Sequence, residues 1–177
     1  EEENETATIL LFKPVYVFDV SQTKGAELPS VIHATGDAAV YLPALEQAIR
    51  TAGIALVAVP AIVEIPGALG VSLGSHIRIR ADLEEADRFR TLAHEFAHEL
   101  LHRQEGLEDR AVRETEADAT AFVVCRHFGV RCDTADYLLL HDSNAKFFLE
   151  RLETIRRTAV RHIEAIECTE SEESAEA

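Results

Sequence analysis

The chain contains 177 residues, of which 47% are hydrophobic, and it carries a net charge of −15. This length and apolar content predict a single domain that can bury a core of its own. Because an acidic surface repels phosphate backbones, the charge argues against nucleic-acid binding by this chain and favours a polypeptide partner.

The sequence contains no long apolar run and no signal-peptide pattern, so we expect no membrane segment and a cytoplasmic location. Its three cysteines lack the C-x-x-C spacing, and they predict neither a disulfide framework nor a cysteine metal site. Both ends are rich in glutamate and poor in apolar residues. Residues 1–11 are therefore predicted to be a disordered or linker lead-in, residues 12–168 the domain, and residues 169–177 a disordered acidic tail.

The first part of the chain predicts strands around one helix. Residues 8–20 are rich in β-branched and aromatic side chains and indicate one or two strands, and a loop over residues 21–37 follows. An apolar stripe at helical spacing predicts a helix over residues 38–52 that ends at Gly53. Residues 54–59 are continuously apolar and predict a further strand.

Two more segments alternate between apolar and polar residues, which predicts strands over residues 62–65 and 76–80. In the second segment, Ile77 and Ile79 are expected to face one way and the neighbouring arginines the other. A long amphipathic helix is predicted over residues 145–166, and its apolar stripe indicates packing against the core. Together these elements predict an α+β fold.

Residues 91–102 contain the motif H-E-x-x-H, formed by His94, Glu95 and His98. On a helix, residues four apart lie on one face, so the two imidazoles can bind one metal ion, with zinc as the expected cofactor. Glu95 lies beside the first of them, where its carboxylate can act as a general base on water. The apolar residues around the motif indicate that its helix packs against the core.

A third metal ligand has to come from another part of the chain. His102 continues the row of His94 and His98, but along a helix axis it lies about 12 Å from His94 and cannot reach the same ion. We therefore predict that His102 is a helix-end residue.

The next helix, predicted from about residue 113 to residue 127, supplies a better candidate. Glu114 precedes Ala117 by three residues and joins the apolar inner face, whereas Glu116 is expected on the polar side. A buried carboxylate needs a partner, and a metal ion on the facing helix would be one. Asp118 can accept the free ring N–H of a ligand histidine. The alternatives are Glu116 as the ligand, or an ordinary acidic helix start without a metal.

The segments H-E-F-A-H-E-L-L-H and E-T-E-A-D-A-T-A-F resemble the gluzincin pattern, H-E-x-x-H followed by E-x-x-x-D. More narrowly, they resemble the ImmA/IrrE metallo-endopeptidases and the metallopeptidase-like domain of ArdC-type antirestriction proteins. The segment Y-V-F-D-V-S-Q-T at residues 16–23 and the residues around His127 favour the ArdC-like branch. The resemblance covers about residues 12–166. ArdC-type proteins also carry a single-stranded-DNA-binding domain, which would precede residue 12.

The resemblance implies a zincin-like fold, in which a small mixed sheet lies beside an active-site helix with the H-E-x-x-H motif and further packing helices. It implies a zinc-dependent endopeptidase that hydrolyses a protein or peptide, in keeping with regulatory proteolysis. In this interpretation, the metal ligands are His94, His98 and Glu114, the base is Glu95, and Asp118 orients a ligand.

In zincins, an extended substrate pairs with the edge strand beside the active-site helix, and residues 76–80 directly precede that helix. The resemblance therefore implies that these residues form an exposed substrate edge. Many such enzymes use a Tyr, His or Arg to stabilise the oxyanion, and the candidates are Tyr137, His141 and His76. The alternative function is an antirestriction or DNA-associated module whose zinc domain is mainly structural or docks a protein partner.

Overall fold

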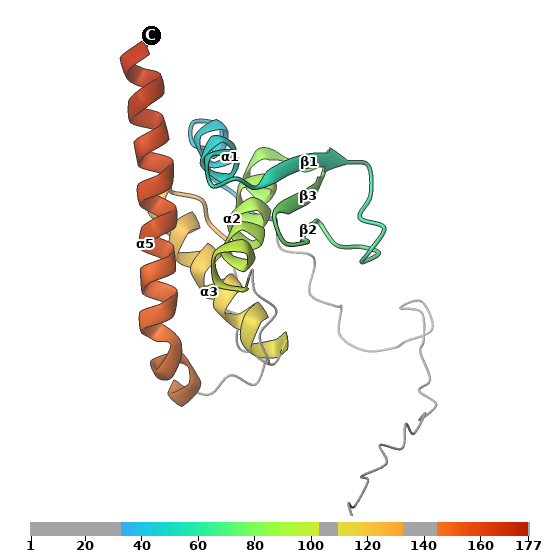
Figure 1. Cartoon of the computed structure of the whole chain (residues 1–177), viewed down its shortest axis with the longest axis vertical. Coiled ribbons are helices and arrows are strands. Elements are labelled where there is room, and N and C mark those ends of the chain that lie inside the picture. Colours follow the sequence, from blue (N-terminus) through green and yellow to red (C-terminus); the bar gives the residue numbers. More distant parts are fainter. Residues whose placement is uncertain (1–32, 103–109, 133–144, 177) are drawn as a thin grey trace, which may run out of the picture. The chain divides into compact units, whose positions relative to one another are not determined.

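The computed structural model describes residues 33–102, 110–132 and 145–176, which belong to one compact unit spanning residues 31–177. The described residues form four helices and a three-stranded mixed sheet (Figure 1). The predicted α+β class is confirmed at this level. The predicted lead-in, the strands expected over residues 8–20 and the boundary at residue 12 lie outside the described residues.

The sheet has the strand order β1-β3-β2, and its strands are β1 (Ala55–Val59), β2 (Gly70–Ser72) and β3 (His76–Arg80). β1 runs parallel to β3, whereas β2 runs antiparallel to it. Because β3 is paired on both sides, the expectation that residues 76–80 form an exposed edge is wrong. The predicted alternation within β3 is confirmed, since Ile77 and Ile79 are fully buried and the arginines are half-buried.

β2 lies where a loop was expected, and the strand predicted over residues 62–65 does not form. Pro66 and Gly67 form a turn after that segment, and the chain becomes extended only at Gly70. A β-carbon on Gly70 would lie 2.7 Å from the Thr91 side chain and 3.0 Å from Cγ of Glu95. The absence of a side chain at Gly70 therefore lets the edge strand β2 approach the following helix closely.

The helices are α1 (Leu42–Thr51), α2 (Glu85–His102), α3 (Arg110–His127) and α5 (Ala145–Glu176). α1 begins later than predicted because residues 38–41 form a turn, and Pro43 lies in its first turn. Gly53, with φ +74°, follows the end of α1 as predicted. α2 is described as far as His102, and the next residues lie outside the described part of the chain, so the helix-end position of His102 stays a prediction.

α5 continues ten residues beyond its predicted end, through the segment expected to be a disordered tail. Thr169 is buried, and its hydroxyl donates a hydrogen bond to the carbonyl of Ala165. The residues that follow are mostly glutamate and alanine, which are good helix formers. An anchored helix can therefore extend through them to Glu176.

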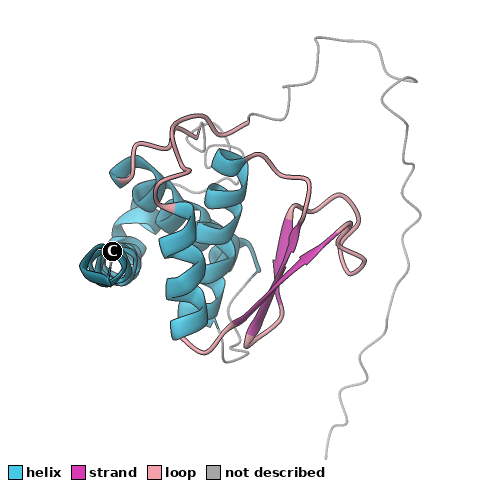
Figure 2. Ribbon diagram, turned by 90° about the horizontal axis from the view of Figure 1, so that it is seen from above, coloured by secondary structure: helices cyan, strands magenta, loops and turns pink. Residues whose placement is uncertain are grey.

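The helices gather on one side of the sheet (Figure 2). α2 packs against β2 and β3 and also contacts the other three helices, while α3 packs against both α2 and α5. The core between them contains the largest buried side chains of the sheet and helices, among them Leu45, Ile77, Phe89, Leu92 and Phe96. No helix in the described part of the chain is long and apolar enough to cross a membrane.

Candidate metal centre

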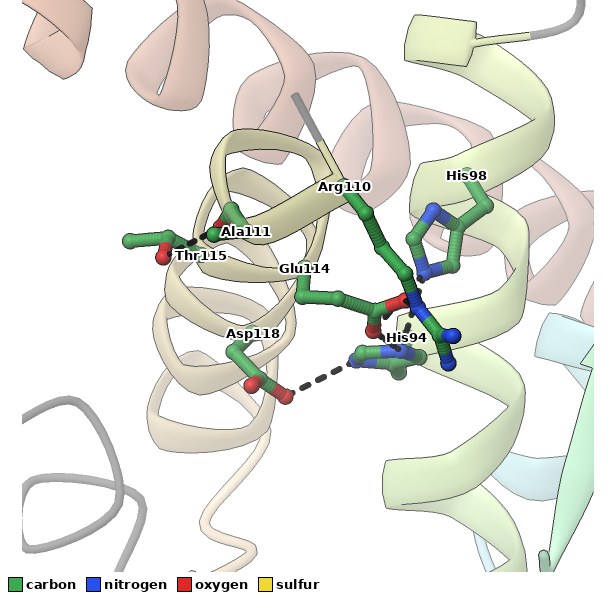
Figure 3. A network of polar contacts seen from close by, with 7 residues as sticks. All are labelled: His94, His98, Arg110, Ala111, Glu114, Thr115 and Asp118. Atoms are coloured by element: carbon green, nitrogen blue, oxygen red, sulfur yellow. Dashed lines mark hydrogen bonds and ion pairs between the residues drawn. The ribbon is translucent and has the colours of Figure 1, made fainter. Parts of the chain in front are cut away.

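His94 and His98 lie one turn apart on α2, and their imidazole rings face the same point (Figure 3). Their Nε2 atoms are 3.0 Å apart, and both side chains are about one-fifth exposed. Leu92, Ala93, Phe96 and Ala97 on the same helix are buried in the core, which fixes the helix and thereby the direction of both rings.

Glu114 completes the cluster from α3. Its Oε2 atom lies 3.5 Å from Nε2 of His94 and 3.5 Å from Nε2 of His98. Within the described residues, His94, His98 and Glu114 are the group of side chains whose ligand atoms come close enough together to hold a metal ion. The structure thus brings together the three residues that the sequence analysis proposed as ligands.

The shape of this cluster fits a tetrahedral metal ion. At zinc–ligand bonds of about 2.0–2.1 Å, two ligand atoms of a tetrahedral site are separated by about 3.3 Å. The three atoms of the cluster form a triangle with sides of 3.0, 3.5 and 3.5 Å. Two imidazoles and one carboxylate are also a donor set that zinc prefers in catalytic sites, where a fourth position stays open.

Asp118 lies behind the first histidine, one turn after Glu114 on α3. Its Oδ1 atom is 2.9 Å from Nδ1 of His94, and its side chain is buried. A carboxylate at this place accepts the Nδ1–H proton, so the lone pair of a neutral His94 is on Nε2 and points at the cluster centre. The predicted contact between Asp118 and a candidate ligand histidine is therefore present.

The carboxylates make this part of the molecule attract positive charge. Burial alone would lower the pKa of His94, but the carboxylates of Asp118 and Glu114 outweigh burial and raise this pKa to about 10. Hydrogen bonds from His94 and His98 hold the pKa of Glu114 far below its ordinary value. A cation at the centre of the cluster, whether a proton or a metal ion, is thus electrostatically favoured.

Glu95 lies beside the cluster and against the edge strand. Its side chain is close to Gly70, and the backbone N–H of Ser72 is directed at its carboxylate. Only 8% of the residue is exposed, and burial raises the pKa of this carboxyl. A buried carboxylate with a raised pKa next to a candidate metal site is suited to accept a proton from water and release it again.

The second acidic residue of α3, Glu116, does not lie on a polar face as predicted. It is only 1% exposed, and its Oε1 atom is 3.3 Å from a guanidinium nitrogen of Arg151 on α5. Thr120, one turn further along α3, is fully buried as well. The prediction assumed one buried face, whereas α3 packs against α2 on one side and α5 on another.

Of the three candidates for oxyanion stabilisation, only His76 lies within the described residues. Tyr137 and His141 lie outside the described residues. His76 is the half-buried first residue of β3 and is not part of the group that could hold a metal.

Two neighbours of the site were not predicted from the sequence. Arg110, four residues before Glu114, has its Nε atom 3.8 Å from Oε1 of that carboxylate. Buried Glu99 accepts hydrogen bonds from the Ser72 hydroxyl, at 2.7 Å, and from the Ser75 backbone N–H, at 2.8 Å. The spacing from Arg110 to Glu114 is a recognisable helical pair, whereas no spacing rule connects Glu99 with the turn before β3.

No family model matches the chain, and no curated protein or solved structure matches it.

Proposed function

We propose that the chain is a zinc-dependent metallo-endopeptidase with a zincin-like fold, in which His94, His98 and Glu114 hold the metal. The observation that carries this proposal is the triangle of ligand atoms, with sides of 3.0, 3.5 and 3.5 Å. The resemblance to the gluzincin pattern supports it from an independent direction. Within that pattern, the ImmA/IrrE and ArdC-type proteins point to regulatory cleavage of a polypeptide.

Zn²⁺ would supply the Lewis-acid chemistry with which such sites polarise a carbonyl group and acidify water. The other steps depend on residues of the chain. Asp118 holds the His94 ring in the orientation and tautomer that its position requires. Glu95 accepts a proton from the attacking water and delivers it to the leaving amine nitrogen. Gly70 and Ser72 place the edge strand beside Glu95, which shields its carboxylate from bulk water.

The proposal is tested with apo protein that is loaded with zinc and incubated with a peptide library, and mass spectrometry identifies the cleavage products. We expect cleavage that a chelator stops and that added zinc restores. Glu95→Gln keeps the size of the side chain and removes the base, so the rate should fall by about 10²–10⁴-fold. Elemental analysis should still find about one zinc ion per chain in this variant.

Glu99→Gln provides a matched control, because Glu99 is a buried carboxylate one turn further along the same helix. This variant should retain most of the activity. Full activity of Glu95→Gln would refute the proposed base. Zinc-loaded wild-type protein that cleaves no peptide would instead favour the alternative, a module whose metal site is structural or docks a partner.

A further inference from the structure

The first turn of α3 has an unusual charge pattern. It contains Arg110 and Arg113 and no acidic residue. The N-terminus of a helix carries the positive end of the helix dipole, so cations there are unfavourable and carboxylates are preferred. Helix stability therefore does not explain the presence of Arg110, and its surroundings have to be considered.

The side chain of Arg110 reaches the metal cluster. Its Nε atom lies 3.8 Å from Oε1 of Glu114, whereas the other oxygen of Glu114 faces both histidines. Figure 3 shows the Arg110 side chain extending from α3 toward the carboxylate of Glu114. The Arg110 side chain is 75% exposed, compared with 19% for His94 and 34% for Glu114. The positive group therefore stands on the accessible side of the cluster.

The pair with Glu114 is too weak to account for this position. At 3.8 Å the two atoms are further apart than in a hydrogen bond, and an exposed pair of this kind contributes about 0–1 kcal/mol. A guanidinium group presents several donors in a planar fork and suits oxygen anions better than a single point charge does.

From this geometry we propose that Arg110 is a catalytic residue that binds the negatively charged oxygen formed when water adds to the substrate carbonyl. This role rests on the proposed peptidase function. As the water oxygen bonds to the carbonyl carbon, the π electron pair moves to the carbonyl oxygen, and Glu95 takes the water proton. The pair then re-forms the carbonyl as the C–N bond breaks, and Glu95 gives the proton to the amine. Arg110 faces the oxygen while it is charged.

Two ligands distinguish this role from a merely structural one. A peptide phosphonate places anionic oxygens on a tetrahedral phosphorus, as in the charged intermediate, whereas the matching peptide thiol offers one sulfur and no such oxygen. Zinc-loaded full-length protein is titrated with each by calorimetry. In Arg110→Gln, phosphonate affinity should fall by about 10–100-fold and thiol affinity should stay unchanged. Arg110→Lys should recover part of the loss, because it restores the charge without the fork.

Arg113→Gln removes the other cation of the same helical turn and should leave the preference for phosphonate over thiol unchanged. In the peptidase assay, Arg110→Gln should lower kcat by about 10²-fold with little change in KM. Equal losses for phosphonate and thiol, together with loss of zinc, would show that Arg110 only positions Glu114 and would overturn the proposal. Phosphonate binding that is absent in the wild type or insensitive to Arg110 would overturn it as well.

A further outcome separates this inference from the peptidase proposal. The wild type could cleave no peptide and still show phosphonate binding that depends on Arg110, with thiol binding that does not. In that case Arg110 stands as the anion contact of the metal site, and the proposed peptidase function fails.

Discussion

Two histidines lie on different sides of helix α2, one among carboxylates and the other in the apolar core. On one side, His94 contacts the carboxylates of Asp118 and Glu114, which raise its pKa to about 10. On the other side, His162 of α5 packs edge-on against Phe96, with ring centroids 4.5 Å apart. Phe96 lies two residues after His94, about 200° further around the helix.

His162 is fully buried, and neither of its ring nitrogens has a hydrogen-bond partner among the described residues. Burial, with a smaller contribution from Arg161, lowers its pKa to about 3. Neighbouring carboxylates, rather than burial alone, thus decide whether a histidine of this chain attracts a cation. The same comparison separates a candidate ligand, His94, from a core residue, His162.

The largest expected effect comes from removing the carboxylate of Glu114, which faces both candidate ligand histidines. Glu114→Ala should weaken zinc binding by more than about 100-fold, because it removes a ligand rather than an outer partner. Competition between the apo protein and a chelating dye measures the affinity. Metal affinity that is unchanged in Glu114→Ala would exclude this carboxylate as a ligand.

Glu116→Ala is the matched control, since this carboxylate lies two residues away on α3 but pairs with Arg151 of α5. It should leave zinc affinity intact and lower the free energy of unfolding by about 1–3 kcal/mol. Urea denaturation of the apo protein measures this change. A loss of zinc binding in Glu116→Ala would mean that the ligand assignment on α3 is wrong.

The second prediction concerns the histidine without partners. The pKa of His162 lies below its ordinary value of 6.5, so its neutral form is favoured in the folded state. The contribution of neutral His162 to the free energy of unfolding is fully present above about pH 6.5. It is lost as the pH falls toward 3, at about 1.4 kcal/mol per pH unit. By about pH 5 the loss should reach about 2 kcal/mol.

His162→Leu is hydrophobic and similar in size, and it should not show this dependence. Apo protein with a chelator present avoids any contribution from metal ligands, and urea denaturation between about pH 7.5 and 5 gives the free energies. The difference between wild type and variant is the informative quantity, since other groups titrate in both. If the two proteins lost stability in parallel, His162 would not be the neutral buried group that the structure shows.

The third prediction tests how much the negative charge of Asp118, behind His94, contributes to zinc affinity. Asp118→Asn keeps an oxygen that can accept the Nδ1–H proton but removes the charge. Zinc affinity should fall by about 10–100-fold, with the fold retained. The same dye competition measures it, and Glu116→Gln serves as the matched control on α3. An affinity equal to that of the wild type would show that the orientation of His94 needs no charge behind it.

Most of the site could be predicted from the spacing of residues along single helices. His94 and His98 are four residues apart, as are Glu114 and Asp118, and each pair needs only a regular helix to reach the same side. Helical spacing also predicted α1, α3 and the central part of α5. The contact between the two pairs is not local, and the resemblance to a known pattern connected them.

The failures have a common physical cause, which is that a residue's surroundings depend on elements far away in sequence. Glu116 was placed on a polar face because nothing in α3 itself indicates that α5 covers it. Residues 76–80 were placed at an edge, although a parallel partner, β1, pairs with one side of them. β2 was missed because it is three residues long and begins at Gly70, a residue that disfavours strands. The tertiary contact of Gly70 with α2 overrides that preference.

The smallest expected effect concerns Glu99, a buried carboxylate whose hydrogen bonds come from β2 and the following turn rather than from a cation. Ser72 and Ser75 both donate to it, but only Ser72 does so with its side chain. Ser72→Ala should therefore leave one buried carboxylate oxygen without this donor and lower the free energy of unfolding by about 1–2 kcal/mol. Zinc affinity should not change, because Glu99 contributes no ligand atom to the metal cluster.

Ser75→Gly keeps the donating N–H and suits the positive φ of 69° at this position, so it should not reduce stability in the same way. Urea denaturation of both variants, with zinc titration alongside, measures the two quantities separately. If Ser72→Ala lowered zinc affinity while the fold kept its stability, Glu99 and β2 would act on the metal site itself. Glu99 would then belong with the residues that attract a cation, rather than with the buried groups whose hydrogen bonds are merely satisfied.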